Sequence, residues 1–135
     1  MDGNIIEGKA FGCWIYQPDI RLNPIWSLRL IPSEIEIHRF KKNGHELKME
    51  TQAGIKIGLS VSIYRKVKHM DDVLERPLLF DKNKNRLELF EELPDGSNVL
   101  VKYNEWEAIS KKDNKIYRGL DLISVMLLDE TPSIF

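Results

Sequence analysis

Basic, aromatic and small side chains alternate with mainly apolar ones along the segment 55–68 of this 135-residue chain. Lys56, Tyr64, Lys66 and Lys68 share one parity there, so an extended strand would present all four on a single face. An aromatic ring can stack on any nucleobase while lysine ammonium groups contact the phosphates. These residue types at this spacing therefore indicate a surface that binds a single-stranded nucleic acid.

Three further segments carry side chains of the same two kinds. Trp14 and Tyr16 are two residues apart and point to one side of their strand, and Arg29 projects from the polar side of the next strand. Lys102 and Trp106 share a parity on a later strand. The predicted DNA-contacting residues are therefore Trp14, Tyr16, Arg29, Lys56, Tyr64, Lys66, Lys68, Lys102 and Trp106. Burial of Trp14, Tyr16 and Trp106 in the core is the alternative, because large aromatic side chains are usually buried.

The charges are distributed unevenly along the chain. Twenty lysines and arginines against 21 acidic residues give a formal net charge of −1. Between His38 and His69, however, eight basic and two acidic residues give +6, which leaves −7 for the rest. A basic middle in an acidic chain is a candidate surface for a polyanion. The alternative is a set of solvated lysines between buried positions.

Sequence motifs for catalysis or metal binding are not found. His38, His45 and His69 have no companion cysteine or carboxylate at zinc-ligand spacing, and 54–58 lacks the residue order of a phosphate-binding loop. Cys13 lies on the apolar parity of its strand, which favours a core position over a nucleophile. We therefore predict no cofactor, no metal site and no enzymatic activity. A metal-dependent nucleic-acid enzyme that uses scattered carboxylates stays open as an alternative.

The location of the protein is also indicated by its composition. A single cysteine excludes an internal disulfide framework and suggests a reducing compartment. No apolar run approaches the roughly 20 residues that a membrane-spanning helix needs, and the polar N-terminus does not resemble a secretory signal. We expect a soluble cytoplasmic protein that does not contact a membrane.

The strand and turn pattern predicts a mainly β domain. Strand-like segments cover 9–16, 25–31, 55–68, 99–106 and 116–128, with a bend expected at Gly58. A short helix is expected after Pro32, capped by Ser33, with Ile35 and Phe40 on one side and an end at Asn43. A strand is the alternative there, because Ile35 and Ile37 also alternate. Five strands and one helix fit a five-stranded OB-type barrel over residues 1–128, whereas an SH3-like barrel and a sandwich stay open. In the second strand Trp26 shares the parity of two leucines, which predicts a core position.

Residues 129–135 read as a separate C-terminal tail. The tail is acidic at its start, contains a proline and finishes on two apolar residues, so it could dock as a peptide into a pocket of a partner protein. Its predicted partner-binding residues are Asp129, Glu130, Pro132, Ile134 and Phe135. Packing of Phe135 against its own barrel is the alternative.

Several short motifs resemble those of phage single-stranded DNA-binding proteins of the podovirus helix-destabilising type. The motifs are Gly8-Lys9-Ala10, Trp14-Ile15-Tyr16-Gln17-Pro18-Asp19, Trp26-Ser27-Leu28-Arg29-Leu30, Pro77-Leu78-Leu79-Phe80-Asp81, and Asp95-Gly96-Ser97-Asn98-Val99 followed by Tyr103 and Trp106. The acidic tail with its final phenylalanine also looks like the protein-recruiting tails of such proteins. Members of the family are longer and carry a more extensive acidic tail than this chain.

This resemblance implies an OB fold without catalysis that coats single-stranded DNA with little sequence preference. It further implies a role in phage replication or recombination inside an infected bacterial host, with replication or recombination proteins recruited through the tail. A homodimer is an open alternative for the oligomeric state. A small β-barrel adaptor or immunity-type protein, which would bind another protein through the same aromatic surface, is the main rival function.

Overall fold

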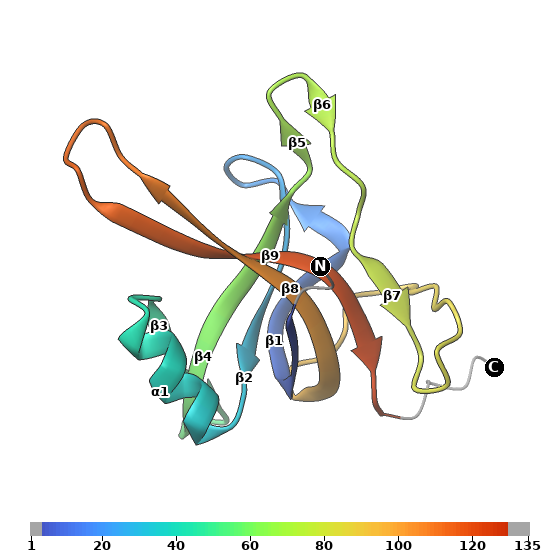
Figure 1. Cartoon of the computed structure of the whole chain (residues 1–135). Helices are drawn as coiled ribbons and strands as arrows, with labels where there is room; N and C mark the ends of the chain where they lie inside the picture. Colours follow the sequence, from blue (N-terminus) through green and yellow to red (C-terminus); the bar gives the residue numbers. More distant parts are fainter. Residues whose placement is uncertain (1–3, 130–135) are drawn as a thin grey trace.

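The computed structural model describes residues 4–129 and consists mainly of β-strands, with one short helix at the side of the sheet (Figure 1). The elements in chain order are β1 (Asn4–Asp19), β2 (Ile25–Ile31), α1 (Glu34–Lys42), β3 (Leu47–Gln52), β4 (Ile55–Lys66), β5 (Lys68–His69), β6 (Asp72–Val73), β7 (Leu78–Phe80), β8 (Ser97–Ile109) and β9 (Ile116–Leu127). Within these residues no helix is long and apolar enough to cross a membrane.

Five of the strands close into a barrel. The sheet order is β3-β4-β2-β1-β8-β9-β7, and an additional parallel pairing of β4 with β9, at Tyr64 and Asp121, joins the two halves. The barrel wall is therefore β1-β2-β4-β9-β8, while β3 and β7 extend it at its edges and β5 pairs with β6 as a separate hairpin. This closed five-stranded arrangement with one short helix confirms the predicted OB-fold barrel.

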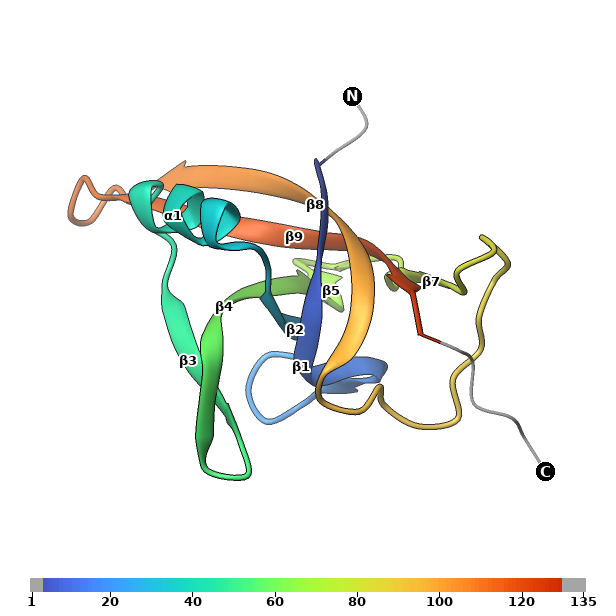
Figure 2. The same cartoon turned by 90° about the horizontal axis from the view of Figure 1, so that it is seen from below.

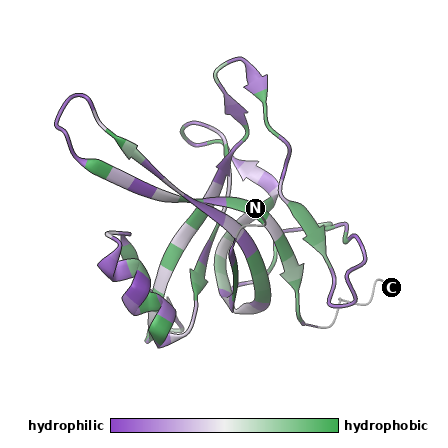
Figure 3. Ribbon diagram, in the orientation of Figure 1, coloured by the Kyte–Doolittle hydropathy of each residue, from purple (hydrophilic) through white to green (hydrophobic). Residues whose placement is uncertain are grey.

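The core forms where alternate side chains of the barrel strands point inward. Hydropathy alternates along these strands, as the colouring of Figure 3 shows. In β1 the predicted inner residues Phe11, Cys13 and Ile15 are buried, and in β2 Trp26 is buried as expected. The inward residues of β8 and β9 complete the core with Val99, Val101, Tyr103, Leu120, Leu122 and Val125.

The first strand continues through the break that the sequence suggested at residues 17–19. It extends to Asp19 because two register shifts against β2, one on each side of Trp14, let the strand bend instead of ending. Gly12 lies in the first shift with φ +56°, and a Cβ atom there would collide with the Arg29 guanidinium. A glycine is therefore required at this bend.

The helix begins and ends as the sequence predicts, but its packing differs. Ser33 occupies the N-cap position of α1 but makes no side-chain capping hydrogen bond there, Asn43 is the C-cap residue, and Phe40 is buried against the barrel. Ile35, which we expected on the same side, is 80% exposed. A nine-residue helix here buries only one narrow stripe, and Ile35 points away from it.

The inward parity predicted for the long strand holds only over its second half. Val61 and Ile63 are buried in β4, whereas Ile55 and Ile57 are exposed, which corrects the expectation for these two residues. The register against β3 shifts between Glu50 and Thr51, opposite the expected bend at Gly58. Beyond this bulge the β3–β4 hairpin leaves the barrel, so no core faces its side chains (Figure 2).

Candidate nucleic-acid interface

The outer face of the barrel carries a row of side chains across three strands. Strand register places Trp14 of β1 opposite Ser27 of β2, and Ser27 opposite Tyr64 of β4. The neighbours Cys13 and Ile63 point inward and are buried, so Trp14 and Tyr64 face outward, and both are half-buried. A small serine between two aromatic rings leaves space above the sheet in which a flat base could lie.

Two hairpins project from the barrel beside this row, β5–β6 and β8–β9 (Figure 1). Between them lies a cavity of about 360 Å³, which we call the hairpin cavity. Its lining residues come from β4, from the β5–β6 hairpin and from both strands of β8–β9, and they are Tyr64, Lys66, His69, Leu74, Asn104, Trp106 and Asp121. The structure thus brings together Tyr64, Lys66 and Trp106 among the predicted residues.

Trp106, which lines the hairpin cavity, closely approaches the backbone of the neighbouring strand. Trp106 of β8 pairs with Gly119 of β9, and any Cβ atom at position 119 would overlap the indole ring. The ring therefore lies flat across the glycine, with 38% of Trp106 exposed toward solvent. A flat, partly exposed indole held by backbone is a suitable surface for stacking.

Tyr117 is a further aromatic residue on this face that the sequence analysis did not select. It is two residues from Gly119 on β9, so both point to the same side of the ribbon, and Tyr117 is 49% exposed. Its hydroxyl donates to Asp113 at 2.9 Å, which orients the ring near the lysine-rich tip at 111–115. The turn at residues 113–114, combined with alternation through 117, 119 and 121, would have indicated this position.

Polar contacts hold the β8–β9 hairpin against the helix. Arg39 donates to the Tyr103 hydroxyl at 2.7 Å, and the His45 Nε2 atom lies 2.8 Å from Glu105 Oε1. On the outer strand, Arg118 donates to the backbone oxygen of Asn43 at 3.3 Å. These contacts fix the direction in which Trp106 and Tyr117 are presented.

Charged groups at the base of the hairpin cavity are paired. Arg65 donates to Asp121 Oδ2 at 2.8 Å, and burial raises the pKa of Asp121 above its ordinary value despite this cation. Burial, followed by the nearby Asp121 carboxylate, also raises the pKa of Tyr64, so its phenol is neutral at physiological pH. Lys66 and Lys68, by contrast, are exposed and make no ion pair with any described residue.

Trp14 and Tyr16 lie at the other end of the row. The Arg21 guanidinium is 5.3 Å from the centre of the Trp14 ring and forms a bidentate pair with Asp19 at 2.9 and 2.7 Å. Trp14 is thus covered on one side by a cation, and Tyr16 is half-buried beside it. Neither Trp14 nor Tyr16 is buried in the core, which was the alternative prediction for both.

Arg29 is engaged within the protein. Its guanidinium donates to both carboxylate oxygens of Glu50, at 2.8 and 3.1 Å, and the Ser60 hydroxyl donates to the same carboxylate at 2.6 Å. Burial disfavours the charged form of Glu50, but the bonds from Arg29 and Ser60 outweigh it and hold the pKa of Glu50 below its ordinary value. The hydrogen bond to Glu50 correspondingly raises the pKa of Arg29.

Lys56 and Lys102 are separate from the hairpin cavity. Lys56 is exposed on the β3–β4 hairpin, eight residues and roughly 26 Å of extended strand from Tyr64. Lys102 pairs with Ile5 of β1 on one side and Ser124 of β9 on the other, before the register shift that precedes Tyr103. The structure therefore does not bring these two lysines to the aromatic residues.

Cys13 is buried, and its thiol is not a reactive nucleophile. Burial, followed by the charges of Glu92 and Asp95, raises the pKa of its thiol to about 12, so the reactive thiolate is not populated near neutral pH. Among residues 4–129, no group of three or more histidine, cysteine or acidic side chains is placed to hold a metal ion.

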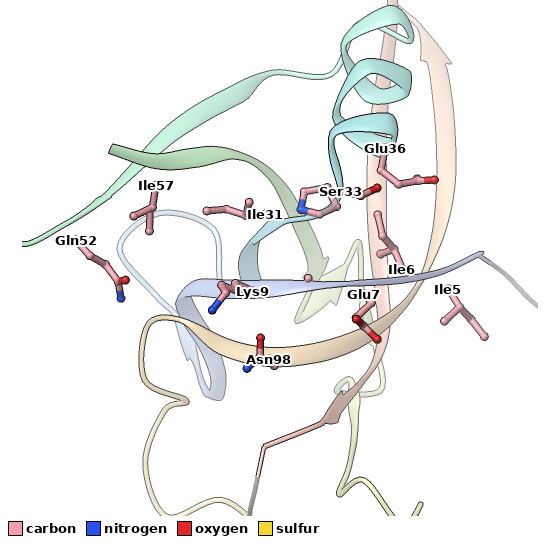
Figure 4. Close-up of a pocket in the computed structure, with 12 residues that line it drawn as sticks. Ile5, Ile6, Glu7, Lys9, Ile31, Ser33, Glu36, Gln52, Ile57 and Asn98 are labelled. Atoms are coloured by element: carbon pink, nitrogen blue, oxygen red, sulfur yellow. The ribbon is translucent and has the colours of Figure 1, made fainter. Parts of the chain in front are cut away.

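A larger groove of about 770 Å³ lies elsewhere on the barrel and contains none of the predicted DNA-contacting residues (Figure 4). Ile5 and Lys9 line it from β1, Ile31 and Ile57 line it from β2 and β4, and Asn98 stands on its β8 side. The backbone amide and the side chain of Asn98 each donate to the Asp129 carboxylate at 2.8 Å. The other predicted tail residues, Glu130, Pro132, Ile134 and Phe135, lie outside the described residues.

No protein-family model and no curated protein matches the sequence. Solved structures do resemble it. The fold matches gp2.5, a single-stranded DNA-binding protein encoded by bacteriophage T7, with a TM-score of 0.62 over 98% of this chain and 90% of that chain at 14% identity. This chain therefore shares the fold of a phage single-stranded DNA-binding protein.

A second solved structure of the same fold is the single-stranded DNA-binding protein from bacteriophage Enc34. It matches with a TM-score of 0.59 over 94% of this chain and 80% of that chain, at 16% identity. The same phage protein in complex with single-stranded DNA matches with a TM-score of 0.59 at 15% identity, over 94% and 85% of the two chains. The family resemblance inferred from short motifs is consistent with these matches.

Proposed function

We propose that this protein binds single-stranded DNA along the outer face of the barrel and through the hairpin cavity. The observation that carries the proposal is the convergence of Tyr64, Lys66 and Trp106 from separate segments of the chain on one cavity. Aromatic rings and an unpaired cation within one cavity suit a polymer of bases and phosphates. The fold shared with phage single-stranded DNA-binding proteins supports the same function.

Bases would stack on Tyr64, Trp106 and Tyr117, and the row would continue across the sheet to Trp14 and Tyr16. Phosphates would be contacted by Lys66 and Lys68 and by the exposed lysines of the β8–β9 tip, Lys111, Lys112 and Lys115. Stacking and charge contacts of this kind do not distinguish the bases, so binding without strong sequence preference is expected. Arg29, Lys56 and Lys102 fall outside this set because of the positions described above.

A mobility-shift or fluorescence titration with single-stranded, double-stranded and RNA oligonucleotides tests this proposal. Single-stranded DNA should bind tightest and should quench tryptophan fluorescence, because Trp106 and Trp14 would contact bases. Equal affinity for duplex DNA would argue against stacking, because paired bases are not accessible to these rings. Hydrolysis of the oligonucleotide when magnesium is added would favour the nucleic-acid enzyme instead.

The proposal extends to the context in which the protein acts. A non-catalytic role in phage replication or recombination within an infected bacterium follows from the same family resemblance, with the tail at 129–135 as the contact for replication or recombination proteins and a homodimer as one oligomeric state. Because Asp129 is bound at Asn98, the tail starts beside the larger groove, which contains no residue of the hairpin cavity. Deleting residues 130–135 should therefore preserve DNA affinity and remove partner proteins from a pull-down, whereas unchanged partners would contradict this role.

A further inference from the structure

One edge of β1 is closed by side chains instead of a strand. Strand β8 pairs with β1 only as far as Ala10, and beyond that point side-chain carboxylates accept amides on this edge. Asp95 accepts the amide of Gly12 at 2.9 Å. Glu92 then accepts three consecutive amides, those of Ile15 and Tyr16 on Oε1 at 2.6 and 2.7 Å and that of Gln17 on Oε2 at 2.8 Å.

Three successive amides that converge on one anion are not the pattern of a regular strand, in which neighbouring amides point to opposite edges. The backbone at Ile15–Gln17 instead curls around the Glu92 carboxylate, within the irregular stretch between Trp14 and Asp19. A concave group of amides of this kind binds phosphate and other anions. A phosphodiester, like a carboxylate, offers two oxygens that share one negative charge, so it suits the same donors.

The surroundings of these amides suit a nucleic acid. They follow Trp14 and flank Tyr16 in the chain, the two aromatic residues at that end of the row. Arg76 donates to the Ile15 backbone oxygen at 2.9 Å and so places a positive charge beside the site. A base stacked on either ring would bring its own phosphate group close to this position.

Glu92 is not itself part of a barrel strand. It belongs to the connection between β7 and β8, which contains no barrel strand. This connection runs along the outside of the barrel in Figure 2. The next residue, Leu93, is buried and anchors that connection to the core. Rotation of the Glu92 side chain alone would therefore open the amides.

We propose that the amides of Ile15, Tyr16 and Gln17 form a phosphate subsite that the Glu92 carboxylate occupies until single-stranded DNA displaces it. This inference rests on the proposed function and adds to it a specific phosphate contact and an internal competitor. Glu92 lowers the affinity for DNA because its own bonds must break before the phosphate binds. Removal of the carboxylate should therefore strengthen binding, although the residue contacts the backbone of the barrel.

Amide and side-chain NMR of the full chain tests the subsite directly. In the wild-type protein, a short oligothymidylate should shift the amide resonances of residues 15–17 and the Glu92 carboxyl resonance together. In E92A, inorganic phosphate alone should shift the same three amides, and DNA affinity should rise at least severalfold more than in E91A. Glu91 is the matched control, because it is the exposed neighbour and its removal changes the net charge equally.

The possible results separate this inference from the proposed function. If the oligonucleotide shifts Tyr64 and Trp106 but leaves the three amides and Glu92 unchanged, the subsite is wrong and the proposed function stands. Equal affinities of E92A and E91A overturn the subsite as well. If no single-stranded DNA binds the wild-type protein, the proposed function itself fails. Should E92A not fold, the wild-type titration and E92Q, which keeps only one accepting oxygen, decide the question.

Discussion

The two ends of β4 differ although the sequence presents them as one basic strand. At the beginning, beyond the bulge at Gly58, Lys56 and Ile57 are exposed on a hairpin that has left the barrel. At the end, Tyr64 and Lys66 line the hairpin cavity together with residues from β8 and β9. This second end combines a cation, Lys66, with an aromatic ring from another strand, Trp106.

The difference shows that neighbouring strands decide what a basic residue can do. Arg29 pairs with Ser62 in the middle of β4, yet its charge is compensated by Glu50 of β3. Lys66 instead pairs with Ile25 of β2 in the strand register, and no described acidic residue forms an ion pair with Lys66. A cation with a bidentate carboxylate partner stabilises the fold, whereas an unpaired one remains available for a phosphate.

The largest effect on function is expected from the aromatic residues of the hairpin cavity. Tyr64→Ala and Trp106→Ala should each weaken binding of single-stranded DNA about 5- to 150-fold, the equivalent of one stacked base at about 1–3 kcal/mol. Ile57→Ala, at the other end of β4, should leave the affinity unchanged. Fluorescence anisotropy with a labelled oligonucleotide measures all three variants. Equal losses at Tyr64 and Ile57 would remove the distinction between the two ends.

Replacement of Arg29 should affect stability and spare DNA binding. Arg29→Met leaves the buried Glu50 carboxylate with Ser60 as its side-chain donor, so the free energy of unfolding should fall by about 1–3 kcal/mol. Urea denaturation followed by circular dichroism measures this change. A marked loss of DNA affinity in the folded variant would instead indicate that Arg29 contacts a phosphate.

The two lysines of β4 should differ in their contribution to the salt dependence of binding. Lys66→Gln should reduce the slope of log affinity against log salt by about 0.7, the value for one phosphate contact with a single strand. Lys56→Gln removes the same charge and should leave the slope unaltered. Titrations at several salt concentrations distinguish them, and an equal change in both slopes would mean that the whole strand faces the DNA.

The smallest effect concerns the pH dependence of stability near the Arg29–Glu50 pair. Because the pKa of Glu50 is lower in the folded protein than its ordinary value of 4.5, its contribution to stability is complete above about pH 4.5. That contribution is lost as the pH falls through the lower folded-state pKa. Wild type should therefore exceed Glu50→Gln in unfolding free energy at neutral pH, and the difference should shrink in acid. A constant difference from pH 7 to pH 3 would contradict this account.

Local alternation was sufficient to predict the barrel strands and much of the core. Phe11, Cys13 and Ile15 are buried as their shared parity indicates, and the helix starts at the expected serine cap. The incorrect predictions concern residues whose burial depends on contacts distant in the sequence. Ile57 is exposed because the bulge at Gly58 carries its hairpin away from the core, a result that no period-2 pattern contains.

The candidate site could be predicted only in part for the same reason. Parity alone identified Tyr64, Lys66 and Trp106, but only the pairing of β4 with β9 places them around one cavity. Glu50, the partner of Arg29, is 21 residues away in the sequence. The ion pair therefore cannot be predicted without the pairing of β3 with β4. Alternation through 117, 119 and 121 indicates the parity of Tyr117, but only the register of the β8–β9 hairpin places it on the same face as Trp106.

Ultraviolet cross-linking of the full protein to an oligothymidylate, followed by mass spectrometry of the cross-linked peptides, tests the central claim most directly. Cross-linking requires contact between a base and a side chain, so it reports which end of β4 meets the DNA. We expect cross-links at Tyr64 and Trp106, with Tyr117 as a further site. Cross-links confined to residues 47–58, with none at Tyr64 or Trp106, would contradict the assignment of the hairpin cavity as the DNA-binding site.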